Sequence, residues 1–409
     1  MNCRFCHSPE LSLVVDLGYS PPSNAYLESK DLVRPEIWYP LRVRVCNECW
    51  LVQTEDYADC DQLFSDDYAY FSSTSQSWLQ HAKKYQEHIT DRLSLNNDSF
   101  VVELASNDGY LLQYFVAANI PCLGIEPTRA AAEQAEEKGI PVLREFFGHQ
   151  LGIGLAKKKG LADLVIGNNV YAHVPDINDF TAGIKAILSA DGVITLEFPH
   201  VLEMLQQNQF DTIYHEHFSY LSLYAVKNIF SKHGLRVWDV ESLPTHGGSL
   251  RIYGCHQDSS RATKGTVRQL LEKESAFGIN SQEIYTEFGE RVVELKNNFL
   301  RFLLDCKLRG LKICGYGAAA KGNTLMNFAG IRPDMIKFVC DAAPSKQGKY
   351  LPGSHIPVIA PDAIRDEKPD VVIVLPWNLI EEIKESLFHI KEWDGRLAVA
   401  LPDVKFLPL

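Results

Sequence analysis

Phe100-Val-Val-Glu-Leu-Ala-Ser-Asn-Asp-Gly109 decides the fold of this 409-residue chain. A short apolar run reaches Glu103, passes through a turn of small residues and enters the helical pattern of Tyr110–Tyr114. This order is typical of the first strand, turn and helix of a nucleotide-binding sheet. Later apolar runs alternate with helical stretches: Cys122–Glu126, Ala162–Ile166 and Gly192–Leu196. The alternation predicts a parallel sheet wrapped by helices.

The turn favours a cationic cofactor over a dinucleotide. Only Gly109 stands where a dinucleotide-binding loop carries three glycines, and a pyrophosphate needs that closely packed loop at a helix N-terminus. Glu103 ends the first strand, and Glu126 ends the second, where an acidic side chain can meet ribose hydroxyls. S-adenosylmethionine (SAM) has a sulfonium and an ammonium but no phosphate, so it fits better than NAD. The expected cofactor-binding residues are Glu103, Ala105, Asn107, Gly109, Glu126, Asn168 and Asn169.

Two Cys-x-x-Cys pairs, Cys3/Cys6 and Cys46/Cys49, indicate a zinc site. Each pair forms a tight turn that aims both sulfurs at one point, so four thiolates can close a tetrahedral shell. Because four cysteines leave no vacant position for a substrate, we expect a structural Zn²⁺. The surrounding stretch has too little apolar sequence to be stable without the ion. We expect the other six cysteines to be buried spectators.

The composition points to a small-molecule partner. A formal net charge of −12 argues against non-specific binding to nucleic acid or to an anionic membrane. No stretch has the length needed to cross a bilayer, and the first residues lack an apolar signal core. We therefore expect a cytoplasmic protein that contacts neither nucleic acid nor membrane.

A second α/β unit is expected near the end of the chain. In Gly315-Tyr-Gly-Ala-Ala-Ala-Lys-Gly-Asn323 a strand meets a helix, so that backbone N–H groups and Lys321 can hold phosphate oxygens. Asp341 ends the following strand, at a position suited to a ribose. A purely structural turn is the alternative for this Gly-x-Gly. Upstream, a turn with two glycines separates the runs Leu235–Val240 and Ser249–Tyr253, which predicts an antiparallel hairpin at the edge of the first sheet.

The segment Phe210–Tyr220 concentrates residues suited to acid–base chemistry. Proton abstraction next to a ketone needs a base and a donor that holds the enolate oxygen. His217 is the candidate base, Glu216 its electrostatic partner or orienter, and Tyr214 the donor. A metal site built on His215 and His217 is less favoured, because these alternate residues have no cysteine nearby. A polar loop with satisfied side chains is the alternative.

Together and in this order, the motifs resemble the zinc-containing, SAM-dependent C-methyltransferases that act on nucleotide-linked keto sugars. The resemblance covers nearly the whole chain. Besides the two cysteine pairs, it is carried by Tyr68-Ala-Tyr-Phe-Ser-Ser73, Glu103–Gly109, Tyr214–His217, Pro244-Thr-His-Gly-Gly248 and Gly315–Lys321.

The resemblance implies that the central domain binds the methyl donor, the C-terminal domain holds the nucleotide diphosphate, and the sugar lies between them. In that family a histidine matching His217 removes the proton next to a C4 ketone, and the enolate attacks the donor methyl group. Tyrosines matching Tyr214 and Tyr68 stabilise the oxyanion, and Tyr70 fits the place of Tyr68 as well. Glu216 and His173 fall at supporting polar positions. The expected substrate-binding residues are Tyr70, Ser72, Ser73, His246, Gly315, Tyr316, Gly317, Lys321, Asn323 and Asp341.

The predicted architecture is α/β, with a zinc-binding module, a Rossmann-like class I methyltransferase domain and a second Rossmann-like domain. Its expected bounds are 1–60 for the module, 61–97 for a helical connection with the active-site tyrosines, 98–260 for the SAM domain, 261–308 for linking helices and 309–409 for the nucleotide-sugar domain. We expect a thymidine diphosphate (TDP) sugar, although the base and methylation at C3 or C5 stay open. The alternatives are a nicotinamide-dependent oxidoreductase of nucleotide sugars and a non-catalytic zinc-containing scaffold.

Overall fold

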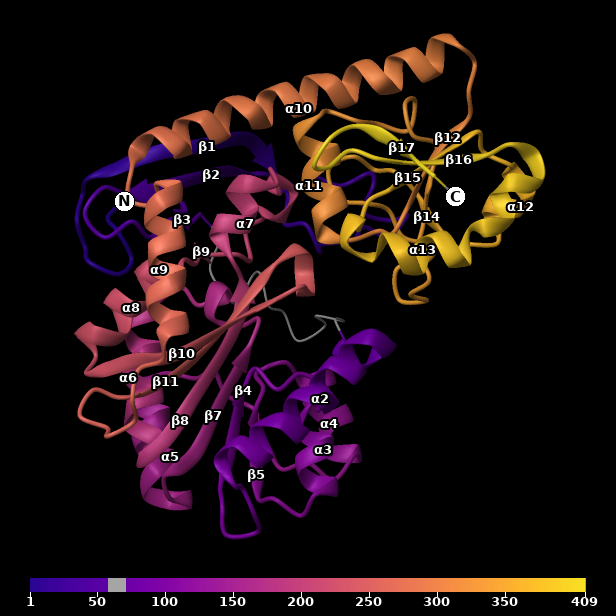
Figure 1. Cartoon of the computed structure of the whole chain (residues 1–409). Helices are drawn as coiled ribbons and strands as arrows, with labels where there is room; N and C mark the ends of the chain where they lie inside the picture. Colours follow the sequence, from indigo (N-terminus) through magenta and orange to yellow (C-terminus); the bar gives the residue numbers. More distant parts are fainter. Residues whose placement is uncertain (58–70, 409) are drawn as a thin grey trace.

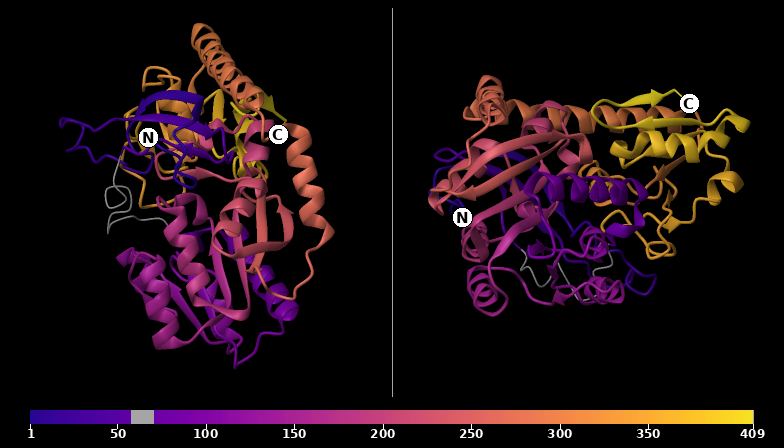
Figure 2. Two further views of the ribbon diagram at one scale, coloured as in Figure 1. Left: turned by 90° about the vertical axis from the view of Figure 1, so that its left-hand side faces the viewer. Right: turned by 60° about the horizontal axis from the view of Figure 1, so that its bottom comes forward.

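The computed structural model describes residues 1–57 and 71–408, which build three sheets (Figure 1). Tyr68 and Tyr70, the predicted active-site tyrosines, lie outside the described residues. The long helix α10 (Gln282–Leu308) runs along the N-terminal sheet to the C-terminal unit, as Figures 1 and 2 show. None of the described helices is both long and apolar enough to span a membrane.

The central sheet has the order β10-β11-β8-β7-β4-β5-β6. Its strands are β4 (Val101–Leu104), β5 (Cys122–Ile125), β6 (Val142–Leu143), β7 (Ala162–Asn168), β8 (Leu188–Pro199), β10 (Leu235–Leu243) and β11 (Ser249–His256). The pairs from β6 through β8 are parallel, whereas β11 pairs antiparallel with both β8 and β10. Every residue of β4 is buried, as expected for a strand covered on both faces. The predicted parallel sheet with a hairpin at its edge is therefore confirmed.

Helices and short 3₁₀ turns surround this sheet. They are η1 (Ser72–Thr74), α2 (Gln76–Leu93), α3 (Leu112–Ala117), α4 (Arg129–Glu137), α5 (His149–Lys159), η2 (Tyr171–His173), α6 (Ile177–Ile187), α7 (Val201–Gln206), η3 (Phe210–Thr212), α8 (Leu223–Lys232) and η4 (Thr245–Gly247). The linking helix α9 (Gly265–Phe277) ends at Gly278, whose left-handed conformation (φ +96°) closes a helix C-terminus without steric cost.

The N-terminal sheet takes one of its strands from the middle of the chain. β1 (Leu11–Ser20), β2 (Tyr39–Cys46) and β3 (Val52–Thr54) are joined by β9 (Ser219–Tyr220), which pairs antiparallel with β3. The apolar face of β1 and β2 packs in one core with α10 and the C-terminal unit. The zinc-binding module is thus stabilised by this shared core as well as by its ion.

The C-terminal sheet has the order β14-β13-β12-β15-β16-β17, parallel except for β17. Its elements are β12 (Ile313–Tyr316), α11 (Ala320–Phe328), β13 (Val339–Cys340), β14 (Val358–Ile359), α12 (Ala363–Glu367), β15 (Val371–Val374), η5 (Trp377–Leu379), α13 (Ile380–Ser386), η6 (Phe388–Trp393), β16 (Arg396–Val399) and β17 (Lys405–Leu407). A second α/β unit was expected here and is present.

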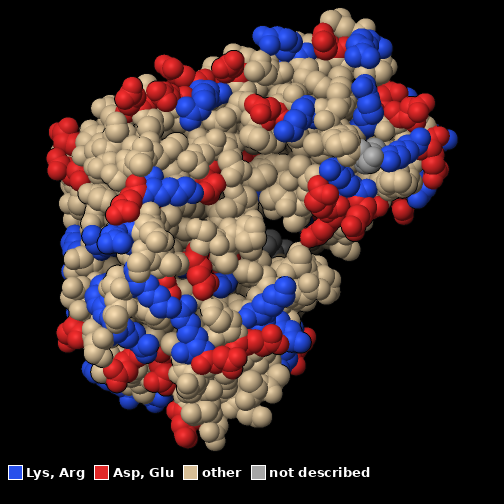
Figure 3. All heavy atoms as spheres, in the orientation of Figure 1, with Lys and Arg blue, Asp and Glu red and all other residues tan. Residues whose placement is uncertain are grey.

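On the face in view, the molecule is hollowed between the C-terminal unit and the central unit (Figure 3). Basic and acidic side chains are interspersed over this face. In Figure 1, the first turns of α2 lie below the C-terminal unit, on the side of the central unit that faces it. Residues from both units can therefore meet one substrate.

Candidate active site

Glu103, at the end of β4, is wholly buried. Among the described residues, neither of its carboxylate oxygens has a hydrogen-bond partner. Burial raises the pKa of Glu103 well above its usual range, and the nearby Tyr110 hydroxyl partly opposes this. A buried carboxyl group with only the Tyr110 hydroxyl near it fits a cationic ligand, because such a ligand would offset the cost of burial.

The turn after β4 has the backbone shape of a ligand-binding loop. Ala105 and Asn107 have positive φ angles of +54° and +49°, and Gly109 has +74°. A Cβ atom on Gly109 would stand 2.2 Å from the Cδ1 atom of Ile140, so only glycine fits there without a shift. The Asn107 N–H donates to Glu126 Oε2 over 2.9 Å. Glu126 therefore braces the loop, in addition to its predicted place beside a ribose.

Asn168 and Asn169 lie at the end of β7, next to β4 in the sheet. Asn168 Nδ2 donates to the Tyr110 hydroxyl over 3.3 Å, and Asn169 Nδ2 lies 3.0 Å from His246 Nε2. The Oδ1 atoms of both asparagines are buried acceptors without a partner in the described part of the chain. Together with Glu103, they give the end of the sheet unpaired polar atoms that can hold SAM.

His217 has the orientation and protonation state of a general base. Its Nδ1–H donates to the Thr212 carbonyl over 2.8 Å, which leaves the lone pair on Nε2. Its ring centroid lies 3.9 Å from that of Tyr214 and 4.6 Å from that of His173. Burial lowers the pKa of His217 well below its usual range. The imidazole is therefore neutral at pH 7.

His173 and Glu216 support this arrangement from two sides. His173 Nδ1–H donates to the main-chain carbonyl of Glu216 over 2.8 Å, and burial lowers the pKa of His173 to about 4. Glu216 Oε1 accepts from Asn24 Nδ2 over 3.2 Å, and burial raises the pKa of its carboxyl group. The Thr212 carbonyl, rather than the Glu216 side chain, accepts the His217 Nδ1–H. Thr212 was not among the predicted residues, since a main-chain acceptor has no side-chain signal.

Lys321, which belongs to the C-terminal unit, lies near His217 and its neighbours. Its ammonium donates to Asn378 Oδ1 over 3.1 Å and lies 4.4 Å from the Trp377 ring centroid. The Trp377 indole N–H donates to Asp211 Oδ2 over 2.7 Å. Burial raises the pKa of Asp211 to about 6, and the charge of Lys321 opposes this rise. The same charge helps to lower the pKa of His217, so the predicted phosphate-binding lysine lies near the predicted base.

The four N-terminal cysteines form a metal site. Their sulfurs lie within 4.8 Å of one another, with 3.5 Å between Cys3 and Cys49 and between Cys6 and Cys46. A tetrahedral zinc shell with Zn–S bonds of about 2.3 Å places its sulfurs about 3.8 Å apart, so the site fits the ion. Within residues 1–57 and 71–408, no other group of three or more potential ligands is this close. His215 instead faces the Pro40 carbonyl at 3.2 Å, away from any shared metal position with His217.

Comparison with known proteins separates the predicted C-methyltransferase from the oxidoreductase and scaffold alternatives. The chain is 34% identical to the C-methyltransferase NovU of Streptomyces niveus over 405 residues, which cover 99% of this chain and 96% of that protein. Family models match a zinc binding domain at residues 3–64, a methyltransferase domain at 77–240 and a C-methyltransferase C-terminal domain at 244–402.

The chain belongs to the C-methyltransferase family.

Solved structures match about half of this C-methyltransferase. A protein of Pyrococcus horikoshii is 12% identical and covers 49% of this chain and all of its own, with a TM-score of 0.38. Magnesium protoporphyrin IX methyltransferase of Synechocystis is 14% identical with the same coverage and a TM-score of 0.35. Membership in the family confirms the predicted SAM-dependent enzyme with a zinc-binding module. The oxidoreductase and scaffold alternatives are thereby removed.

The remaining predicted residues of this C-methyltransferase lie in two places. The N–H groups of Ser72 and Ser73 donate to Asn107 Oδ1 and Asp108 Oδ2, over 2.9 and 3.2 Å. The 3₁₀ turn η1 therefore lies on the turn after β4, residues 105–109, which we call the cofactor loop. Asn323 is wholly buried and donates to the Ser23 carbonyl over 3.3 Å, which turns it toward the N-terminal sheet.

The glycine turn of the C-terminal unit is closely packed. A Cβ atom on Gly315 would lie 2.9 Å from Val339, and one on Gly317 (φ +86°) would lie 2.4 Å from Pro376. The following residue, Ala318, receives a hydrogen bond from Lys346 Nζ at 2.8 Å, and Lys346 also lies 3.4 Å from Asp341 Oδ2. Tyr316, the last residue of β12, is half-buried. Lys346 is a second cation near the predicted phosphate turn that sequence reasoning missed.

Glu197, at the end of β8, is a buried carboxylate that sequence reasoning also missed. It accepts from Arg251 Nη2 at 2.6 Å, from His81 Nε2 at 3.0 Å and from the Thr245 hydroxyl at 3.0 Å. Burial would raise the pKa of Glu197, but the hydrogen bond from His81 and the charge of Arg251 outweigh it and hold this pKa at about 2. This anion therefore joins α2, β11 and the turn that carries His246.

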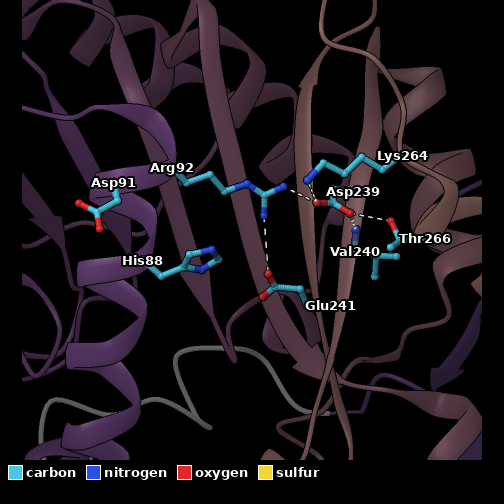
Figure 4. Close-up of a pocket in the computed structure, with 8 residues that line it drawn as sticks. All are labelled: His88, Asp91, Arg92, Asp239, Val240, Glu241, Lys264 and Thr266. Carbon is cyan, nitrogen blue, oxygen red and sulfur yellow. Dashed lines mark hydrogen bonds and ion pairs between the residues drawn. The ribbon is translucent and has the colours of Figure 1, made fainter.

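A surface pocket of about 580 Å³ lies near the C-terminal end of α2 (Figure 4). Four of its charged groups are already paired with one another: Arg92 with Asp239 and Glu241, and Lys264 with Asp239 at 3.2 Å. Such mutual pairing leaves little for a charged ligand to gain. The predicted catalytic groups of this C-methyltransferase lie elsewhere, around His217.

Proposed function

We propose that this C-methyltransferase acts on a nucleotide diphosphate 4-keto deoxy sugar and methylates C3 or C5 through an enolate formed by His217. TDP is the expected nucleotide. The observation that carries the proposal is the neutral His217 imidazole, whose Nδ1–H is held by Thr212 and whose ring contacts Tyr214 and His173. Both C3 and C5 flank a C4 ketone, so one base suits either position.

The first step removes a proton from carbon. The Nε2 lone pair of His217 takes the proton next to the C4 ketone, and the electrons of the C–H bond move to the carbonyl oxygen. A neutral imidazole accepts this proton directly, and a positioned base typically contributes about 10²- to 10⁴-fold in rate. Tyr214, whose ring packs on that of His217, would donate to the enolate oxygen. The hydrogen bond between His173 and the Glu216 carbonyl fixes the orientation of the His173 ring beside the base.

The second step forms the carbon–carbon bond. SAM supplies an electrophilic methyl group, and Glu103, Asn168 and Asn169 would hold it. As the enolate carbon bonds to the methyl carbon, the methyl–sulfur bond breaks and its electrons stay on sulfur. The residues therefore only have to create the nucleophile and align it, which is where proximity contributes most. The proton taken by His217 returns to solvent.

The nucleotide would lie on the C-terminal unit. An ammonium has three donors, so Lys321 keeps donor capacity beyond its hydrogen bond to Asn378, and the close-packed Gly315–Gly317 turn precedes its helix. Because the charge of Lys321 also reaches His217, a ligand that contacts this ammonium would place its sugar near the base. Burial, aided by the charge of Lys321, lowers the pKa of His246 to about 4, so His246, beside Asn169, also lies near this lysine.

Mass spectrometry in deuterated buffer tests the proposal. The purified protein is incubated with SAM and TDP-, GDP- and CDP-linked 4-keto-6-deoxy sugars, and any product is examined by NMR. We expect one added methyl group on carbon in the presence of SAM, and deuterium at the same α position when SAM is left out, because exchange then replaces methyl transfer. A panel without methylation or deuterium entry would refute the sugar assignment.

The variant His217→Asn separates the base from the other groups. It should lose both methylation and α-proton exchange, whereas His215→Asn, at the neighbouring histidine that faces Pro40, should keep exchange. Normal exchange in His217→Asn would remove His217 from the role of base.

A further inference from the structure

Trp78 lies in the first turn of α2, and the residues just before this helix are hydrogen-bonded to the cofactor loop. The N–H groups of Ser72 and Ser73, just before the helix, donate to the side chains of Asn107 and Asp108. Lys138 Nζ reinforces this contact by donating to Ser73 Oγ over 2.9 Å and to the Asp108 carbonyl over 2.6 Å. The helix therefore begins directly beside the predicted donor site.

The indole of Trp78 contacts aromatic rings from both halves of the site. Its ring centroid lies 5.8 Å from that of Tyr110, the residue that follows the cofactor loop, with the planes nearly parallel at 29°. It lies 5.2 Å from the ring of His246, which in turn approaches Asn169 at the end of β7. The half-buried Trp78 side chain thus spans from the cofactor loop to the turn that carries His246.

The position of this indole is fixed by its own helix. One turn along α2, His81 packs on Trp78 at 4.9 Å and donates to the buried Glu197 carboxylate at 3.0 Å. Two turns along, the Tyr85 hydroxyl bonds to Thr195 Oγ1 at 2.5 Å. Trp78 is therefore held in place before any ligand arrives.

The electrostatics of the donor make such a ring useful. SAM carries a positive sulfonium, whereas the product S-adenosylhomocysteine (SAH) has a neutral thioether at the same atom. The face of an indole attracts a cation electrostatically, whereas a neutral thioether makes only the weaker sulfur–aromatic contact, without the charge term. The unpaired Oδ1 atoms of Asn168 and Asn169 add negative partial charge at the end of the same sheet.

We propose that Trp78 forms one wall of the site for the sulfonium group and favours SAM over SAH. This inference rests on SAM binding at the Glu103 loop and not on the identity of the sugar. Discrimination against the neutral product would help the enzyme to release it after each transfer.

Calorimetry on the full-length, zinc-loaded protein tests the inference by measuring Kd for SAM and for SAH. In Trp78→Leu we expect the preference for SAM over SAH to fall by about 3- to 10-fold. Trp78→Phe keeps a smaller ring and should fall in between. The matched control is Trp393→Leu in the C-terminal unit, where the indole N–H only bonds to the Pro369 carbonyl, and its preference should match that of the wild type.

Other outcomes would overturn the inference. An equal loss of affinity for both ligands in Trp78→Leu would make the residue a structural support only. An unchanged preference in both Trp78 variants would show that the sulfonium does not meet this ring. Thermal unfolding identifies folded variants, and Trp78→Phe keeps the test decisive if Trp78→Leu does not fold. Wild-type protein that binds neither ligand would refute the donor site itself, and with it the inference.

Discussion

Replacement of Glu197 by glutamine should destabilise the protein in a way that depends on pH. Glu197 is wholly buried and accepts hydrogen bonds from Arg251, His81 and Thr245. Its pKa falls from the usual 4.5 to about 2 in the folded protein. At 1.36 kcal/mol for each pH unit, this difference corresponds to about 3 kcal/mol of folding free energy from the ionised carboxylate.

The sign of the effect follows from the direction of the shift. Because the folded-state pKa of Glu197 is depressed, its contribution is complete above pH 4.5 and disappears as the pH falls toward 2. Glu197→Gln should therefore be about 3 kcal/mol less stable than the wild type at pH 6, and the two should converge near pH 2. Urea unfolding at several pH values measures this difference, in which other titrating carboxylates cancel.

A surface carboxylate provides the control. Glu133 pairs with Arg129 at 2.9 Å and Arg144 at 3.4 Å while 46% of its side chain stays exposed. Glu133→Gln should change stability far less than Glu197→Gln at every pH, because exposed ion pairs are screened by solvent. A Glu197→Gln difference that stays constant from pH 6 to pH 2 would refute the electrostatic reasoning and leave only a packing effect.

Three further predictions concern the loop, the metal and the nucleotide. Gly109→Ala should cost about 1 to 3 kcal/mol and weaken SAM binding, because its Cβ meets Ile140. Gly139→Ala, with a similar φ but open space, should cost only about 1 kcal/mol, and equal costs in thermal unfolding would contradict the steric argument. Cys6→Ala should reduce zinc below one ion per chain in elemental analysis and lower the melting temperature; an unchanged temperature after zinc loss would contradict a structural ion. Lys321→Met should raise KM for the nucleotide sugar about 10- to 100-fold and leave Kd for SAM unchanged, whereas an unchanged KM would remove the phosphate contact.

The sheets could be predicted because their strands are buried on both faces. Val371–Val374 reads as a continuous apolar run and Val101–Leu104 is interrupted only by Glu103, and all residues of both strands are buried. The edge hairpin could be predicted from the turn residues Gly247-Gly248, both of which have positive φ angles. The four zinc ligands were equally readable, since each Cys-x-x-Cys pair is local and its geometry needs little from the rest of the fold.

Contacts between distant segments gave no such signal. Glu197 looks like an ordinary strand residue, and its partners His81 and Arg251 lie 116 and 54 residues away in the sequence. The approach of Lys321 to Asp211 depends on how the C-terminal unit sits against the central unit, which no local pattern encodes. β9 is only two residues long, too short for any periodicity to reveal it.

The pairing of β3 with β9 also bears on the order of events during synthesis. β3 gains its second neighbour only after Tyr220 has left the ribosome, and the face of the N-terminal sheet is covered by α10 residues such as Tyr285 and Val292. At 5 to 20 residues per second, the interval between the synthesis of Cys49 and that of Val292 in α10 lasts roughly 10 to 50 s. Cys3, Cys6, Cys46 and Cys49 are all available from the start of that interval. Metal capture can therefore stabilise the nascent N-terminal segment well before its core is complete.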